Sequence, residues 1–394
     1  MRSLTAFLLL IVAAVGTEAQ TPLRPDAFPP VAEKPIKGIV MAESVEEMLT
    51  WDRYPTYETY TDMMQRFATQ HSAICRLDTI GYSYGGRLLL SLVIEGNEPR
   101  REMLYSGTIH GNEPLGSVLL LHLADTLLAS YGSNPQITNL LDTVAVAIIP
   151  ISNPDGLYHD GNHTIEGGTR YNANGADLNR NFPDPFGATP IDTLQRENQT
   201  LIDYISRHRF THAASLHSGG EVLNYPWDSF TASQRRHPQW QWWEETCRRF
   251  VAIVRQHDSQ RLRTVRDCGY ITGGDWYVIS NGRQDYLNYY HAIYDLTIEL
   301  SQTKQIASDQ LPHYWHAYAA ALIDYIGIVP PAAVPSAIHA ANQQNATLTA
   351  YPNPTTGEIT VRLGDRQSHY DLRQHPSGLI ILNAFGHTLK VIKR

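Results

Sequence analysis

The sequence predicts an α/β protein with a mixed, largely parallel central sheet flanked by helices, followed by a small C-terminal β module. Strand-like runs alternate with helical runs between residues 46 and 327, as in a sheet that helices cover. The run TVAVAIIPISNPDG (143–156) begins almost wholly apolar, which is typical of a central strand buried on both faces. After Gly327 the chain becomes Pro/Ala-rich and then alternates like short strands, which indicates a second, smaller unit.

The first 19 residues have the features of a secretory signal peptide. Arg2 supplies a positive charge, residues 4–15 form a short apolar core, and Thr17 and Ala19 are small residues at the cleavage-site positions. The core is shorter than the roughly 20 apolar residues that span a bilayer, so a signal peptide is favoured over a membrane anchor. No later segment is long and apolar enough to span. Residues 20–45, rich in Pro and polar residues, are expected to form an N-terminal arm.

The order of elements can be predicted along the domain at residues 46–327. The predicted strands combine apolar or β-branched residues with bounding turn residues, at 74–96 (two strands around a Gly-Gly turn), 101–111, 143–149, 210–219 and 294–302. The predicted helices have apolar residues at helical spacing, at 51–71, 114–132, 197–208, 238–257 and 311–327.

The C-terminal segment divides into a predicted linker, residues 328–349, and a predicted β module, residues 350–394. In the module, the turn NPTTG precedes the alternating strand EITVRL, and the chain closes with GLIIL and TLKVIKR.

Composition restricts the class of protein. The 394 residues are 42% hydrophobic and 18% charged, so a sizeable core is expected. A net charge of −8 argues against a nucleic-acid binder, which normally has a basic surface. An exported chain could oxidise one pair of its three cysteines, and Cys247 with Cys268 is favoured over a pair that includes the distant Cys75.

Polar residues follow several of the predicted strands, and His110, Glu113 and His217 stand out among them. Ligands of open α/β sheets bind beyond the carboxyl ends of strands, so these three side chains are expected to converge. A single histidine is more often a surface or hydrogen-bonded residue than a ligand. Two imidazoles and one carboxylate together, however, are the ligand set of a catalytic zinc ion with a position left for water.

A hydrolytic zinc site also needs a base and a group that holds the substrate. Glu299 occupies a position in the strand LTIEL where an unpaired carboxylate would be costly, so it either pairs with a cation or works in a cavity. The segment TRYNANGADLNRNFPD carries Arg170, Asn179 and Arg180. Arginine matches a carboxylate bidentately, which suggests an anionic substrate group, although ordinary salt bridges within a loop are the alternative.

In their order along the chain, HGNE, NPDG, RYNANGADLNRNFPD, SLHSGGEVLNYPWD, DWYVISNGRQDYLNY and LTIELS resemble the zinc metallocarboxypeptidases, and more closely their carboxypeptidase N/E-like branch. The resemblance covers residues 51–327 and makes residues 46–327 the catalytic domain. It implies one Zn²⁺ per chain, with zinc ligands His110, Glu113 and His217. It also implies that Glu299 is the general base and that Arg170 polarises the scissile carbonyl.

The resemblance also implies how substrate is held. Asn179 and Arg180 look like the clamp on the C-terminal carboxylate, and Tyr277 looks like the mobile tyrosine that closes over it; Tyr270 lies in the same loop but does not fit the spacing. Asp228 and Gln284 occupy the positions of the pocket for the last side chain. A carboxylate there would select Lys or Arg over an apolar residue.

Two features depart from the family's pattern. Residues 20–45 are too few for the folded inhibitory pro-domain of the digestive carboxypeptidases. The C-terminal segment is too short for the transthyretin-like domain of the N/E-like branch and resembles a sorting domain of the type IX secretion system. That resemblance implies a Gram-negative source, a partner in the export machinery, removal of the tail, and a secreted or cell-surface protein with no transmembrane segment after signal removal.

The sequence therefore predicts a secreted zinc exopeptidase that releases single C-terminal residues, preferably Lys or Arg, from peptides or proteins. Two alternatives stay open. One is a zinc amidase acting on cell-wall peptides or N-acyl amino acids, which would share the metal ligands. The other is a catalytically inactive carboxypeptidase-like module that binds peptides.

Overall fold

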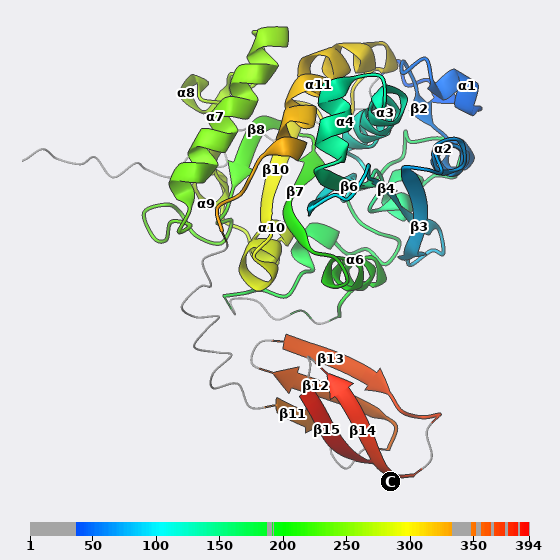
Figure 1. Ribbon diagram of the computed structural model, residues 1–394, viewed down its shortest axis with the longest axis vertical. Coiled ribbons are helices and arrows are strands. Elements are labelled where there is room, and N and C mark those ends of the chain that lie inside the picture. The colour runs from blue at the N-terminus through cyan, green and yellow to red at the C-terminus, as the bar shows by residue number, and fades with distance from the viewer. Residues whose placement is uncertain are drawn as a thin grey trace, which may run out of the picture.

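A mixed sheet of eight strands runs through the larger part of the chain (Figure 1). The computed structural model describes residues 37–186, 191, 193–332, 348–351, 356–363, 366–374, 377–384 and 387–393. The strand order is β3-β4-β6-β5-β7-β10-β8-β9. The strands are β3 (Cys75–Tyr82), β4 (Leu88–Ile94), β5 (Arg101–Gly107), β6 (Val144–Ile149), β7 (Phe210–His217), β8 (Gly220–Tyr225), β9 (Tyr270–Thr272) and β10 (Tyr294–Ser301).

The centre of the sheet is parallel, and its margins contain the antiparallel pairs. Strands β6, β5, β7 and β10 are parallel neighbours, whereas β4 is antiparallel to β3 and β6, and β8 is antiparallel to β10. The carboxyl ends of β5, β7 and β10 consequently lie at one edge. In this register His217 of β7 is the partner of Glu299 of β10.

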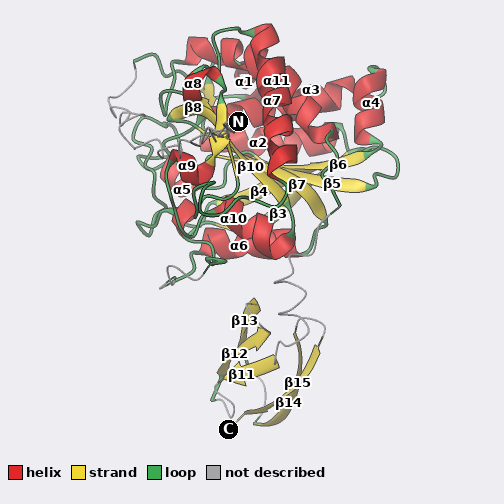
Figure 2. Cartoon of the chain, turned by 90° about the vertical axis from the view of Figure 1, so that its left-hand side faces the viewer, coloured by secondary structure: helices red, strands yellow, loops and turns green. Residues whose placement is uncertain are grey.

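Two hydrophobic cores cover the two faces of the sheet. Side chains alternate between faces along a strand, so Leu92 and Ile94 of β4 enter the larger core while Val93 enters the smaller one. Figure 2 shows α3, α7 and α11 on one side of the sheet and α6 on the other. The larger core includes buried residues of α2 (Tyr57–Gln70), α3 (Leu115–Ser130), α7 (Trp240–His257) and α11 (Leu311–Gly327), and the smaller one those of α6 (Arg196–Ser206).

Local sequence explains the longer helices. In α2, Tyr60, Met63, Met64 and Phe67 recur at helical spacing and are buried, and the Thr56 hydroxyl accepts from the backbone N–H of Thr59 as an N-cap. Most of α3 is buried, as expected for its nearly continuous apolar sequence. No single described helix is long and apolar enough to cross a membrane; α3 and α4 (Pro135–Leu141) together reach the length and composition, but they are bent by 107°.

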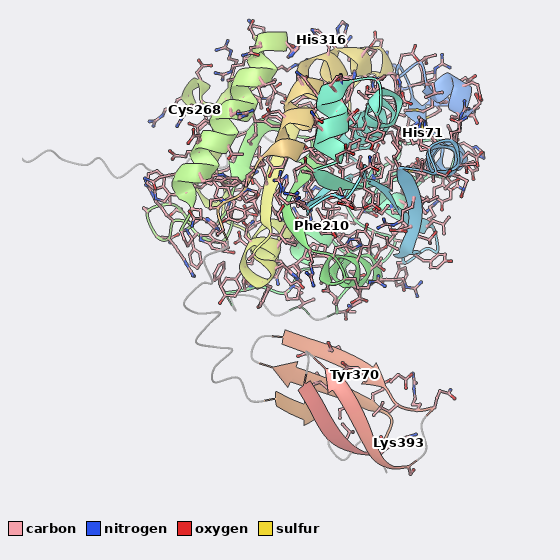
Figure 3. The ribbon with its side chains drawn as sticks, viewed as in Figure 1. His71, Phe210, Cys268, His316, Tyr370 and Lys393 are labelled. Carbon is pink, nitrogen blue, oxygen red and sulfur yellow. The ribbon has the colours of Figure 1, made fainter. Side chains whose placement is uncertain are left out.

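The predicted fold class is confirmed, and every predicted strand and helix between residues 51 and 327 has a counterpart. Strands β8 and β9, helix α4 and several single-turn helices were not predicted. The favoured disulfide is wrong, because all three cysteines are free. Cys247 is buried in the core on α7, whereas Cys268 is exposed beside α8 (Thr264–Asp267) (Figure 3).

The C-terminal segment contains the expected strands. Strands β11 (Leu348–Tyr351), β12 (Glu358–Leu363) and β13 (Arg366–Asp371) form an antiparallel sheet, and β14 (Gly378–Ala384) pairs with β15 (His387–Lys393). Ile359, Leu372 and Val391 are buried together. The signal-peptide prediction, the linker at 333–347 and most of the NPTTG turn lie outside the described residues.

Candidate metal centre and substrate site

A turn between β5 and α3 presents His110 and Glu113 close together. Strand β5 ends at Gly107, and the backbone N–H of Glu113 donates to the His110 carbonyl at 3.1 Å, which closes the turn. Gly111 lies so close to the backbone of Gly156 in α5 (Pro154–Leu157) that a Cβ at Gly111 would overlap it. This close approach fixes the turn and, with it, the positions of its two functional side chains.

His217 reaches the same place from β7, whose parallel neighbour is β5. Its Nδ1 lies 3.1 Å from Glu113 Oε2, and the Nδ1 of His110 lies 3.0 Å from Glu113 Oε1. All three side chains are buried, and their ligand atoms lie within 4.8 Å of one another. Within the described ranges, no other group of His, Cys, Asp or Glu is arranged to hold a metal ion.

The surroundings of the two imidazoles fit a metal ion. His110 Nε2 faces Asp177 Oδ1 at 3.3 Å, and His217 Nε2 lies 3.1 Å from Ser215 Oγ. The Nδ1 atoms of both imidazoles face the carboxylate oxygens of Glu113, so two nitrogens and one carboxylate converge on one place where a cation could be bound. Two nitrogens and one carboxylate suit zinc, so His110, Glu113 and His217 form a zinc site.

Electrostatics keep these ligands in their metal-binding forms. Burial alone would raise the pKa of Glu113, but the two imidazoles hold it well below its usual range. The backbone N–H of Ser218 also donates to Glu113 Oε2 at 3.1 Å. Burial lowers the pKa of His217, which favours the neutral imidazole that a metal requires.

Asp177 connects the zinc site to the cationic segment. Its Oδ2 accepts from Arg170 Nε at 2.8 Å, and its Oδ1 faces His110 and accepts from the backbone N–H of Asn179 at 2.9 Å. Sequence reasoning missed Asp177, although its place between Arg170 and Asn179 in one polar segment was a usable signal. It also missed Ser215, which lies two residues before His217 and therefore on the same face of β7.

The predicted cationic residues surround this centre. Arg170 Nη1 lies 3.3 Å from His110 Nδ1 and 3.9 Å from Glu113 Oε1. Arg180 ends the short helix Leu178–Arg180 and donates to the Asn179 carbonyl at 2.8 Å. Its charge partly offsets the effect of burial, which raises the pKa of the nearby Tyr277. Tyr277 is 40% exposed, so it lies at the surface of the site rather than inside it.

Glu299 is buried on β10 beside His217. Its Oε2 has no hydrogen-bond partner among the residues that the structure describes. Burial and the negative charge of Glu113 raise the pKa of Glu299 well above its usual range, and Arg170 offsets this only in part. A bound divalent cation would act in the opposite direction and favour the ionised carboxylate.

Asp228 and Gln284 meet in a buried pair. Gln284 Nε2 donates to Asp228 Oδ1 at 2.6 Å, and Gln284 Oε1 accepts from the backbone N–H of Thr297 at 2.9 Å. Burial and the neighbouring Asp285 raise the pKa of Asp228 well above its usual range. Tyr270, the alternative to Tyr277, instead interacts with Arg248 of α7.

The fold and this centre together define a class, that of zinc hydrolases built on a mixed α/β sheet. Within the class the family is identified by sequence. Residues 60–321 match the zinc carboxypeptidase family, and the chain belongs to that family, as the sequence motifs predicted.

Two curated relatives and one solved structure illustrate the similarity. The chain is 32% identical over 298 residues to carboxypeptidase M of Mus musculus, covering 70% of this chain and 65% of that protein. It is 31% identical over 294 residues to carboxypeptidase D of Anas platyrhynchos, covering 68% of this chain and 20% of that protein. It therefore spans between one fifth and two thirds of the length of these relatives. Carboxypeptidase A from Helicoverpa armigera has a similar fold, with a TM-score of 0.60 at 18% identity over 73% of this chain and 75% of that one.

Gly111→Ala should weaken zinc binding because the added Cβ would push the turn away from α5. We expect zinc affinity to fall about tenfold or more in competition with a chelator. Gly327→Ala is the matched control, since its Cβ would meet only a methyl group of Leu140 at 3.3 Å. Equal zinc affinity in the two variants would contradict the role assigned to the close approach.

Proposed function

We propose that this protein is a zinc-dependent exopeptidase that releases single C-terminal residues, preferably Lys or Arg, from peptides or proteins. The observation that carries the proposal is the set of contacts made by Asp177. One carboxylate contacts the zinc ligand His110, the side chain of Arg170 and the backbone of Asn179. The groups proposed to polarise the scissile carbonyl and to hold the chain end are thereby fixed relative to the zinc ligands.

The substrate's terminal carboxylate is proposed to bind Arg180 and Asn179. Asn179 Oδ1 already accepts from the backbone N–H of Arg283 at 3.0 Å, so its NH₂ group is the part that can donate to a carboxylate. Arg180 can donate two parallel hydrogen bonds. Because Tyr277 lies near Arg180 and is partly exposed, it is placed to move when a carboxylate binds Arg180 and to cover the bound chain end.

The chemistry then divides among the chain's own residues. A bound zinc ion would supply a Lewis acid and make water acidic enough to attack at neutral pH. Glu299 takes a proton from the attacking water and later gives it to the departing amine. Arg170 donates to the carbonyl oxygen, where the negative charge develops, and such a preorganised donor contributes on the order of 3 kcal/mol.

A preference for Lys or Arg is supported by the buried pair of Asp228 and Gln284. A carboxylate in a buried pocket gains most from a cationic partner, because burial otherwise disfavours its charge. An ammonium or guanidinium group of the substrate would restore the ionised form of Asp228. An apolar last residue would leave this carboxylate without a cationic partner, which is the basis of selection.

We also propose that the protein is exported, on the basis of the pattern of residues 1–19 and the tail's resemblance to a type IX sorting domain. In a Gram-negative host with that secretion system, the full chain should reach the cell surface or the medium. Deletion of 1–19 should retain it in the cytoplasm, and deletion of 350–394 should leave active enzyme in the periplasm. Fractionation with activity assays measures this; export of the tail-less chain would contradict the sorting role.

Glu299→Gln should retain zinc and lose turnover by about 10²–10⁴-fold, because the amide cannot accept the proton. Turnover is measured on a peptide ending in Arg, and zinc content by elemental analysis. Glu221→Gln on the adjacent strand β8 is the matched control, since Glu299 and Glu221 are both 7% exposed. Substantial activity in Glu299→Gln would exclude Glu299 as the base.

The specificity pocket is tested with peptides ending in Arg, Lys, Phe and Asp. For the wild type we expect kcat/KM to be highest for Arg and Lys and to vanish with a chelator. Asp228→Asn should lower kcat/KM for Arg by about tenfold or more, with little change for Phe, because only the cationic side chain loses a charge partner.

Two further substrates discriminate between the competing functions. The same peptides with amidated C-termini should be poor substrates, since they offer no carboxylate to Arg180 and Asn179. N-acetyl amino acids test the amidase alternative. Cleavage of amidated peptides as fast as free ones would contradict a carboxypeptidase, and no turnover by the zinc-loaded protein would favour an inactive binding module.

A further inference from the structure

A single helical turn contacts both Asn179 of the proposed carboxylate clamp and Asp228 of the proposed side-chain pocket. In α10 (Arg283–Tyr286) the backbone N–H of Arg283 donates to Asn179, and the side chain of Gln284 donates to Asp228. The carboxylate of Asp285 accepts the backbone N–H groups of Asp228 at 2.8 Å and of Ser229 at 2.9 Å. The position of α10 therefore determines how far the carboxylate clamp lies from the side-chain pocket.

A buried ion pair attaches this turn to β10. Arg283 is 2% exposed and Asp295 is fully buried, with Arg283 Nη2 at 3.3 Å from Asp295 Oδ1. Apart from this pair, neither the guanidinium nitrogens nor the carboxylate oxygens have a hydrogen-bond partner within the described part of the chain. The second attachment is the bond from the Thr297 N–H to Gln284, so two contacts fix α10 to the same strand.

The geometry of β10 connects the ion pair to the catalytic residues. Asp295, Thr297 and Glu299 alternate with Leu296, Ile298 and Leu300, which belong to the larger core. Residues two apart share a face of a strand, so the side chains of the ion-pair partner Asp295 and of the proposed base Glu299 lie on the same face. Thr297, which binds Gln284 through its backbone N–H, lies between them in the sequence. Figure 1 shows α10 beside β10.

The buried ion pair is not expected to raise the free energy of unfolding. Burial lowers the pKa of Arg283, and burial raises the pKa of Asp295 to about 6 although Arg283 offsets part of the effect. Removing two charges from water is costly, and well-packed apolar residues in their place are often equally or more stable. A reason other than stability is therefore needed for a buried arginine with a single partner.

We propose that Arg283 and Asp295 are positioning residues that fix α10 and thereby set the spacing between the terminal-carboxylate clamp and the Lys/Arg pocket. The inference rests on the proposed function and deepens it. Neither side chain touches the substrate; they act through Asn179, Gln284 and Asp228. Loss of the pair should loosen both contacts at once, which raises KM and lowers selectivity while the proton transfers at Glu299 continue.

The test is the double variant Arg283→Met with Asp295→Leu, which removes both charges and leaves no unpaired partner. We expect its affinity for L-arginine, measured by calorimetry, to fall about tenfold or more, since misplaced hydrogen bonds to a charged ligand lose at least that factor in binding. KM for a peptide ending in Arg should rise by the same factor, with kcat within about threefold. Arg283→Lys keeps the charge and should be intermediate.

Controls separate positioning from stability. Arg261 and Glu221 form a second pair at 3.3 Å, with side chains 20% and 10% exposed, and Arg261→Met with Glu221→Leu should change Tm without changing KM or arginine affinity. If the α10 double variant likewise changes only Tm, the proposal is overturned. If that variant does not fold, wild-type arginine affinity in Arg283→Lys overturns it.

The two proposals fail differently. A wild type that binds L-arginine but cleaves no peptide contradicts the exopeptidase function, while the loss of arginine affinity in the double variant would still support positioning by the ion pair. A wild type that cleaves Arg-ending peptides, with a double variant of unchanged KM and selectivity, contradicts the positioning alone.

Discussion

The site depends on the compensation of buried negative charge. Glu113 and Glu299 are buried and Asp177 is close by. Arg170 Nε lies 2.8 Å from Asp177 Oδ2, and Arg170 Nη1 lies 3.9 Å from Glu113 Oε1. In a medium of low polarity, so many carboxylates are unfavourable without further positive charge. A divalent cation bound by His110, Glu113 and His217 would supply this positive charge. The buried carboxylates are therefore stabilised by the metal ion, and they in turn favour its binding.

The central sheet fixes the relative positions of the residues in this centre. His217 and Glu299 are register partners on parallel strands β7 and β10, so backbone hydrogen bonds fix the distance between a zinc ligand and the proposed base. The other ligands lie on a turn that packs directly against α5, because Gly111 allows an approach that a larger residue would prevent. The zinc ligands and the proposed base are thus positioned by strands and by a tightly packed turn rather than by long loops.

Periodicity and residue chemistry predicted much of the fold and the zinc ligands. The apolar run of β6 and the helical spacing in α2 are local signals, and His110, Glu113 and His217 follow strands whose ends meet. Contacts between residues far apart in the sequence were harder to predict. Nothing local shows that Asp177 faces His110, and the wrong Cys247–Cys268 pair came from sequence separation, which does not report that one thiol is buried and the other exposed.

The row of polar residues on β10 suggests how the cleavage point and the selected side chain are matched. Two residues along a strand advance about 7 Å, so Glu299, Thr297 and Asp295 mark equal intervals along one face. The proposed base lies at the first position, the attachment of Gln284 at the second and the attachment of α10 at the third. Because one strand carries Glu299 and the attachments of Gln284 and α10, the geometry of β10 fixes the distance between the proposed base and the buried pair of Asp228 and Gln284. Under the proposed function, the recognition of the last side chain and the cleavage of its peptide bond would be coupled through the geometry of this strand.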